Sequence, residues 1–270
     1  MTKNIKIIFI LITIILITLK ILFVSKSNLN FDDHRYIAHA GGGYKDIAYS
    51  NSEESVLKSI ENGYKLIELD LLITSDNYIV AMHDWINFKK NCEGYSKEFN
   101  NEPITLEEFK NCNYKIKDQK FNQLDENKIN ELFKYNNEIF LVTDKIRDYK
   151  LLAKKFNFNK RIIPEVFSLI DYLSARAYGF ENILFPYKSY NFVYKHLFGV
   201  NLISVSYEDF IRNKMKINKL FRNGMHIFVY SSNDENFIIE NVNKNITGVY
   251  VDFWDLNEQK CISNSNCLSY

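Results

Sequence analysis

The sequence lacks an excess of charge of either sign. Its 34 basic and 33 acidic side chains give a formal net charge of +1, so bulk charge gives no reason to expect a nucleic-acid partner. General disorder is also excluded as an expectation, because 46% of the residues are hydrophobic and 25% are charged. There is no internal repeat and no low-complexity tract. Only three prolines occur, and we interpret their scarcity as coding bias without functional content.

Cysteine is scarce too, and its four copies fall in two close pairs. Cys92 and Cys112 bracket one polar loop, while Cys261 and Cys267 lie near each other in the tail. Four cysteines allow three pairings, of which the local one is the simplest. Disulfides require an oxidising compartment, so this interpretation favours export, whereas four unrelated thiols would carry no such meaning.

One hydrophobic run near the N-terminus has no polar face, and no small-x-small cleavage signal follows it. Residues 7–19 are Ile, Leu, Phe and Thr throughout, Lys20 interrupts them, and residues 21–24 continue the run. Such a run is typical of a signal peptide or of a spanning helix of about 18 residues. We favour an uncleaved membrane anchor at residues 1–26, followed by a polar linker at 27–35.

The charges that flank this run bear on topology. Lys3 and Lys6 would stay in the cytoplasm by the positive-inside tendency, which places the rest of the chain outside. Lys20 and Lys26 on the other side weaken that indication. We therefore expect a membrane-anchored, extracytoplasmic domain, or a secreted one if the segment is cleaved.

Strand and helix signals alternate over residues 36–270. Eight short apolar segments alternate with helical stretches, which predicts a parallel sheet, and the count of eight favours a closed barrel. The length also suits such a barrel, which runs to about 250 residues. The predicted fold is thus an α/β protein, a (β/α)8 TIM barrel with an N-terminal hydrophobic anchor helix. The expected strands are 36–39, 65–70, 139–143, 162–166, 182–185, 202–205, 226–230 and 248–252, and the expected helices are 52–62, 148–156, 168–178, 189–198, 207–222 and 233–242.

The connection between the second and third strands is unusually long, from 71 to 138. We expect it to contain a hairpin, with a turn at 75–77, then the loop between the cysteines and a helix around 125–135. The insertion proper would span about 84–125. Long connections in compact domains are usually functional, so this one is expected to lie over the barrel mouth.

Ionisable residues gather where the first two strands end. His39 ends the first strand, and Glu68 and Asp70 end the second. Because side chains alternate along a strand, the two carboxylates share one face and point into the mouth. Buried unpaired carboxylates are costly, so a hard divalent cation, magnesium or calcium, is their natural partner.

A second histidine follows the hairpin. The hairpin would return His83 to the same mouth, where two imidazoles beside a metal-bound phosphate suit a general acid and a general base. Asp84 would orient an imidazole. The glycines at 41–43 follow His39 and would let backbone N–H groups approach an anionic oxygen, although a flexible turn explains them equally well.

These motifs resemble the signature of the glycerophosphodiester phosphodiesterase family. Their order and spacing match over about 50 residues, and weaker similarity extends almost to the C-terminus. The matching segments are Ile37-Ala38-His39-Ala40-Gly41-Gly42, Asn51-Ser52, Gly63, Glu68-Leu69-Asp70, Thr74-Ser75-Asp76 and His83-Asp84.

The resemblance implies a TIM barrel that hydrolyses a phosphodiester with a divalent metal ion. It implies His39 and His83 as the acid–base pair and Glu68 and Asp70 as metal ligands. The family's third ligand ends the third strand, where Asp144 is the best match. It is commonly followed two positions later by a lysine that contacts phosphate. Here Lys145 follows one position early, and it joins Gly41 and Gly42 as the expected phosphate-binding residues.

Two departures from the family pattern affect the expected binding of phosphate. Ala40 replaces the arginine that usually follows the first histidine, and Tyr49-Ser50-Asn51-Ser52 replaces Pro-Glu-Asn-Thr. The loss of the arginine puts phosphate affinity or substrate type in question. Glu165 ends the fourth strand in a suitable place and is a further candidate.

Three functional hypotheses follow. The leading one is metal-dependent hydrolysis of a glycerophosphodiester, or of another lipid- or envelope-derived diester, at the outer membrane face. The others are a non-catalytic barrel that binds phosphate or glycans, and a phospholipase D-like or cyclising phosphodiesterase. Aromatic residues of the insertion would contact the substrate or only pack the lid; they are Trp85, Phe88, Tyr95 and Phe99.

Overall fold

The fold comes from a computed structural model that describes residues 29–31, 33–96, 98–263 and 265–267, with the scattered positions 5, 8, 10, 11, 13, 14, 17 and 18. The predicted anchor at 1–26 lies largely outside these residues, as do positions 27, 28 and 32 of the predicted linker. Within the described part of the chain, no helix has the length and apolar character needed to cross a membrane. The anchor therefore stays a prediction.

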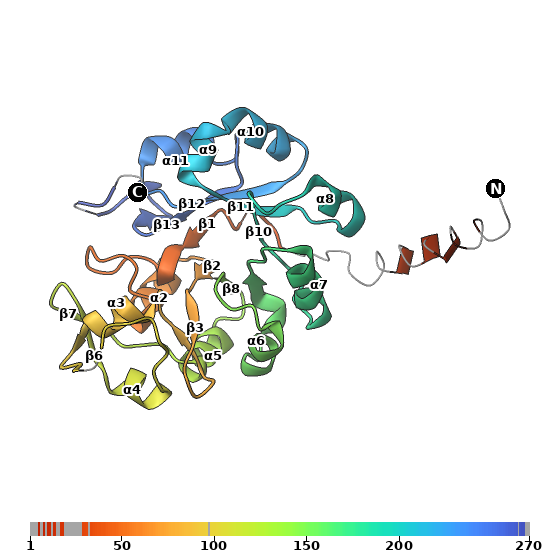
Figure 1. Cartoon of the computed structure of the whole chain (residues 1–270). Helices are drawn as coiled ribbons and strands as arrows, with labels where there is room; N and C mark the ends of the chain where they lie inside the picture. Colours follow the sequence, from red (N-terminus) through yellow and green to blue (C-terminus); the bar gives the residue numbers. More distant parts are fainter. Residues whose placement is uncertain are drawn as a thin grey trace.

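Eight parallel strands form the centre of the molecule, and the predicted segments supply all of them (Figure 1). They are neighbours in the order β10-β11-β12-β13-β1-β2-β8-β9. Their bounds are β1 (Tyr36–Ala38), β2 (Leu66–Glu68), β8 (Phe140–Thr143), β9 (Ile162–Pro164), β10 (Phe185–Pro186), β11 (Leu202–Ser206), β12 (His226–Tyr230) and β13 (Gly248–Val251).

The two edges of this sheet meet. The N–H of Leu184 donates to Pro164 O at 3.1 Å, and the N–H of Val166 donates to Leu184 O at 2.8 Å. A parallel bridge between Glu165 and Leu184 completes the contact. The sheet is therefore closed in the manner of a TIM barrel, as the alternation of elements predicted.

Helices connect the strands and cover the outside of the barrel. Ser52 caps the first of them, as predicted, by accepting a hydrogen bond from Ser55 N at 3.3 Å. One prediction was wrong in detail, because 207–222 forms two helices that Asn213 separates. The helices are α2 (Glu53–Glu61), α5 (Glu126–Tyr135), α6 (Tyr149–Lys155), α7 (Leu169–Ala177), α8 (Phe192–Phe198), α9 (Tyr207–Arg212), α10 (Lys214–Arg222) and α11 (Glu235–Asn241).

Every barrel strand, or the residue beside it, contributes one apolar side chain to an interior layer of the barrel. Leu29 and Phe31 pack against this layer from below. The ring of Phe31 stacks on His226 with centroids 3.8 Å apart, and the ring of His34 meets Phe140 at 5.7 Å. The segment before β1 thus plugs the amino-terminal end of the barrel. The layer consists of Ile37, Leu66, Val142, Ile163, Leu184, Leu202, Phe228 and Tyr250.

The long connection after β2 forms a small unit with its own apolar core. The predicted hairpin is present, and the predicted Cys92–Cys112 disulfide ties the unit together. A second disulfide joins Cys261 to Cys267 in the tail. The elements of the unit are β3 (Leu71–Ile73), β4 (Ile79–Ala81), α3 (Trp85–Lys90), β5 (Cys92–Glu93), α4 (Leu106–Asn111), β6 (Asn113–Ile116) and β7 (Gln119–Lys120).

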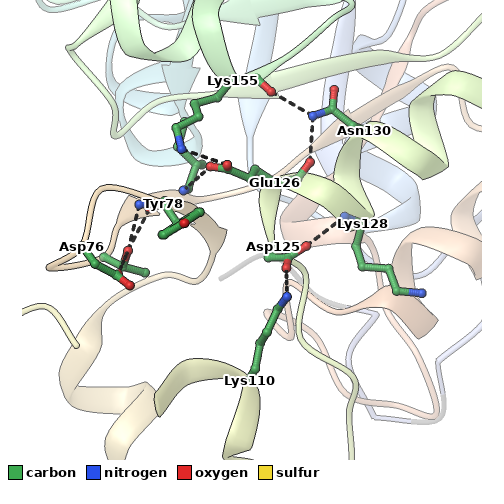
Figure 2. A network of polar contacts seen from close by, with 10 residues as sticks. Asp76, Tyr78, Lys110, Asp125, Glu126, Lys128, Asn130 and Lys155 are labelled. Atoms are coloured by element: carbon green, nitrogen blue, oxygen red, sulfur yellow. Dashed lines mark hydrogen bonds and ion pairs between the residues drawn. The ribbon is translucent and has the colours of Figure 1, made fainter. Parts of the chain in front are cut away.

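A polar network at the start of α5 joins this unit to the barrel (Figure 2). Glu126 accepts hydrogen bonds from Ile79 N at 2.8 Å and from Lys155 Nζ at 2.9 Å. Asp125 caps the helix through Lys128 N at 2.9 Å and forms an ion pair with Lys110. Strand β4, helix α4 and helix α6 are thereby held around one helical turn.

Candidate active site

Because side chains alternate along a strand, residues two positions beyond the interior layer also point into the barrel, and several of them are polar. Two residues beyond Ile37 lies His39, and two beyond Val142 lies Asp144. A cavity of about 270 Å³ opens at the carboxyl ends of the strands, where barrel active sites lie. It is lined by seven residues that the sequence singled out, His39, Glu68, Asp70, His83, Asp144, Lys145 and Glu165, and by Tyr49, Val142, Phe167, Tyr230 and Tyr250.

Three carboxylates converge in this cavity. Ligand atoms of Glu68, Asp70 and Asp144 all lie within 4.8 Å of one another. Burial, followed by repulsion from Asp70, raises the pKa of Asp144 to about 6 and the pKa of Glu68 well above its usual value. Within the described residues, Asp144 Oδ1 is buried and lacks a hydrogen-bond partner. Crowded, partly orphaned carboxylate oxygens are the donor set that a hard divalent cation prefers, so the cluster fits such an ion.

Backbone and amide groups orient these carboxylates. Asn51 holds Asp70 at two points, since its Nδ2 donates to Oδ2 at 2.9 Å and its Oδ1 accepts from Asp70 N at 3.0 Å. The N–H of Ala40 donates to Glu68 Oε2 at 2.7 Å. Lys145 Nζ lies 3.0 Å from Asp70 Oδ1 and also donates to the carbonyl of His83. Lys145 thus links the acidic cluster to the second histidine.

His39 has a carboxylate partner that sequence reasoning missed. Its Nδ1 lies 3.3 Å from Asp252 Oδ1, an electrostatic contact without hydrogen-bond alignment. Asn233 fixes Asp252, because its Nδ2 donates to Oδ2 at 2.9 Å and its Oδ1 accepts from Asp252 N at 2.8 Å. The available signal was that Asp252 lies two residues beyond the inward-facing Tyr250.

His83 also has a carboxylate partner, which the sequence did predict. Its Nδ1 contacts Asp84 Oδ2 at 2.7 Å. Partial burial disfavours the charge of Asp84, but hydrogen bonds from Asn87 and His83 outweigh it and lower the pKa of Asp84. The side chain of His83 is 49% exposed, against 11% for His39. His83 therefore lies at the open end of the cavity and His39 at its deep end.

Tyr49 separates the two histidines. Its ring meets His39 edge-on at a centroid distance of 4.3 Å and His83 at 5.9 Å. Tyr49 stands where the family pattern has proline, and its φ of 61° directs the ring into the mouth. Sequence reasoning noted the substitution but not this consequence.

Two expected phosphate-binding residues are placed elsewhere. Gly42 donates its N–H to His39 O at 2.7 Å, and a Cβ at this position would lie 2.2 Å from Ser59 Oγ. Gly41 packs on Ser55 and Val56 of α2, and its carbonyl accepts a hydrogen bond from Ser59 Oγ at 2.7 Å. The glycines therefore allow close packing of α2, and the N–H of Gly42 is already used.

The aromatic residues of the insertion are likewise not in the cavity wall. Trp85 and Phe88 are 3% and 0% exposed and belong to the insertion's own core. Their rings pack edge-to-face at 6.2 Å, and Phe88 stacks on Phe109 at 4.8 Å. For Trp85 and Phe88 the structure therefore supports packing, whereas Phe99 is 51% exposed.

Comparisons with solved structures agree with this fold. A glycerophosphodiester phosphodiesterase from Parabacteroides distasonis matches at 17% identity and a TM-score of 0.62, over 82% of this chain and 93% of that one. One from Thermotoga maritima matches at 20% and 0.60, over 81% and 94%. An Oleispira antarctica phosphodiesterase in complex with the product sn-glycerol-3-phosphate matches at 16% and 0.62, over 81% and 92%. None of the curated proteins compared matches the chain.

A comparison with protein-family models finds a match to one segment of the chain. The matched segment, 39–172, contains both histidines, the three clustered carboxylates and Lys145. Residues 39–172 match the model of the glycerophosphoryl diester phosphodiesterase family, a family of phosphoric diester hydrolases.

Proposed function

We propose that the chain hydrolyses a glycerophosphodiester, or a related diester from lipid or envelope polymer, with a divalent cation, Mg²⁺ or Ca²⁺. The observation that carries this proposal is the convergence of three carboxylates and two carboxylate-paired histidines on one cavity. The product bound to the Oleispira antarctica phosphodiesterase supports the substrate class.

The acidic cluster is the site for the cation. Glu68, Asp70 and Asp144 would hold it through their converging oxygens, because a cation would relieve the repulsion among the three carboxylates. A bound divalent cation supplies Lewis-acid stabilisation of the charge that develops on the phosphate oxygens. Lys145, at the wall between Asp70 and His83, adds positive charge beside the same phosphate.

The two histidines carry out the proton transfers, one from the nucleophile and one to the leaving group. In each, a carboxylate contacts Nδ1, which orients the ring and leaves Nε2 to act on the substrate. One imidazole accepts the proton of the nucleophile, which is water or a neighbouring substrate hydroxyl. The other donates a proton to the leaving alkoxide. Groups of this kind contribute roughly 10²–10⁴-fold each to the rate.

We place this activity at the outer face of a membrane, as a proposal that follows from sequence. The apolar run at 7–24 supports it, and the two disulfides are consistent with an oxidising compartment. Diesters released from membrane lipid or envelope polymer would then be the local substrates.

A cyclising reaction is a second candidate for the same site. Tyr49 occupies the space between the histidines, where it narrows the approach of water to the phosphate. A substrate hydroxyl held beside the phosphate would then compete with water as the nucleophile. Water attack gives a free phosphomonoester, whereas hydroxyl attack gives a cyclic phosphate, so the products distinguish the two reactions.

The test is a turnover assay on purified protein with ³¹P NMR detection of products. Glycerophosphodiesters, lysophospholipids and glycerol-phosphate polymers should be compared in the presence of Mg²⁺ or Ca²⁺. We expect turnover of at least one substrate, its loss on chelation and its recovery when the metal is restored. Negligible turnover of all three by folded, metal-loaded protein would favour the binding-module hypothesis, which Ala40 motivates.

A further inference from the structure

One wall of the cavity has no part in the proposed chemistry. The acidic cluster and His39 lie at or just beyond the ends of β1, β2 and β8, which are neighbours in the barrel. The remaining wall comes from β9, β12 and β13 and the residues just beyond them. It presents Glu165, Phe167, Tyr230 and Tyr250 to the same cavity. A diester held at the acidic cluster has two alcohol arms, and this wall is available to one of them.

Glu165 is the only carboxylate of this wall among the described lining residues. It lies two residues beyond Ile163 of the interior layer, so alternation points its side chain into the cavity. Ser204 of β11, two residues beyond Leu202, donates its hydroxyl to Glu165 Oε1. Within the described chain no hydrogen bond reaches Oε2. One oxygen is therefore anchored while the other is available to a ligand.

The surroundings of Glu165 favour a neutral hydrogen-bonding role. Burial raises the pKa of Glu165 to about 7, although the hydroxyl of Ser204 partly opposes that effect. No ion pair to Glu165 occurs among the residues that the structure describes. Tyr250 is buried and Tyr230 is 40% exposed, so aromatic faces and phenol groups border the carboxyl. A carboxyl in such a wall offers both a donor and an acceptor to a hydroxyl group.

We propose that Glu165 is a specificity-determining residue that binds a hydroxyl group on one alcohol arm of the diester. Tyr230 and Phe167 bound the same subsite, and Ser204 is a positioning residue that fixes the carboxyl. The subsite selects polyol esters, such as those of glycerol or a sugar, over plain alkyl esters. This inference rests on the proposed function of the cavity.

Three chromogenic diesters with one shared leaving group provide the test. They are the p-nitrophenyl phosphates of glycerol, of propanol and of choline, which present a polyol, an alkyl and a cationic arm. We expect wild-type protein with metal to prefer the glyceryl ester. Glu165→Leu should raise KM for that ester roughly 3- to 10-fold, the effect of losing one neutral hydrogen bond, and leave kcat and the propyl ester nearly unchanged.

A matched pair of variants separates hydrogen bonding from charge and from misfolding. Glu165→Gln keeps an amide donor and acceptor, so it should retain most of the glyceryl preference. Glu131→Leu, the same change at an exposed glutamate on α5, should behave as wild type. Unchanged propyl turnover in Glu165→Leu shows that the variant is folded. Ser204→Ala should lower the glyceryl preference without abolishing it.

The remaining outcomes overturn the inference. A wild-type preference for the choline ester that Glu165→Gln removes would assign the subsite to a cation. A glyceryl preference that survives in Glu165→Leu would place recognition elsewhere. Turnover of the three esters at equal rates in every variant would reject the subsite while leaving the proposed function intact. Failure of wild-type protein to hydrolyse any of them would instead count against the function itself.

Discussion

Both candidate catalytic histidines and one of the clustered carboxylates are held by neighbouring polar side chains. Asp252 orients His39, Asp84 orients His83, and Asn51 holds Asp70. Such partners fix ring orientation and ligand geometry, and their loss typically costs 10–100-fold in metal affinity or activity. Substitutions at the site therefore fall into two kinds: those that remove a reacting group, and those that remove the neighbour that holds it in place.

Removal of either imidazole should abolish most of the activity. His39→Ala and His83→Ala should each lower kcat by roughly 10²–10⁴-fold, because each removes a proton-transfer group. Circular dichroism and thermal melting should show a folded barrel in both variants. A folded variant with a near-normal rate would remove that histidine from the mechanism.

Loss of the hydrogen bonds that hold Asp70 should mainly weaken metal binding. Asn51→Leu deletes both hydrogen bonds to Asp70, so we expect about 10–100-fold weaker binding of Mg²⁺ or Ca²⁺ by titration calorimetry. Excess metal should restore much of the rate. Ser50→Ala, which alters a neighbouring hydroxyl outside the cluster, is the control. Equal metal affinity in wild type and Asn51→Leu would show that the amide has no such role.

At the scale of elements, local sequence predicted most of the barrel. Short runs such as Leu202–Ser206 are rich in β-branched and apolar residues, and side-chain alternation along them was enough to place Glu68 and Asp70. Long-range contacts were not accessible in this way. Nothing local indicates that Asp252 meets His39, or that the N–H of Gly42 is used within its own turn. The division of α9 from α10 depends on Asn213, whose amide donates to Asp209 O at 3.0 Å.

The first turn of α5 should control how firmly the insertion is attached. Glu126→Leu leaves the buried Ile79 N–H and the ammonium of Lys155 without their acceptor, which should lower the free energy of unfolding by about 1–3 kcal/mol. Urea denaturation measures this change. Glu131→Leu on the exposed face of α5 is the matched control. Since β4 leads directly to His83, turnover should fall as well. A variant as stable as wild type would show that Glu126 does not hold the insertion to the barrel.

At the scale of the whole molecule, the acidic cluster couples stability to pH and metal. The folded-state pKa of Asp144, about 6, lies above its ordinary value, so ionisation of the cluster costs stability above that pH. The cost is relieved as the pH falls from about 6 toward the ordinary aspartate value. Bound cation offsets the same cost at neutral pH, because it prefers the ionised carboxylates.

Thermal melting should reveal this coupling. In metal-free protein at pH 8, Asp144→Asn should raise Tm, and this gain should shrink as the pH falls to 5. Added Mg²⁺ or Ca²⁺ should raise Tm of wild type but raise that of the variant less. A metal-free Asp144→Asn protein that melts below wild type at pH 8 would show that the cluster is not under electrostatic strain.

The plug formed by Leu29 and Phe31 makes the two ends of the barrel different, one closed and one open. Leu29 lies at the sealed base of the barrel, while the aperture opens at the opposite end, where the strands end. The longest barrel strands, β11 and β12, have five residues each, so they span on the order of 15 Å between the two ends. A surface beside the base of the barrel would therefore face the end opposite the aperture. Water-borne diesters and polymer chains reach such an aperture directly, whereas a diester still embedded in that surface lies behind it.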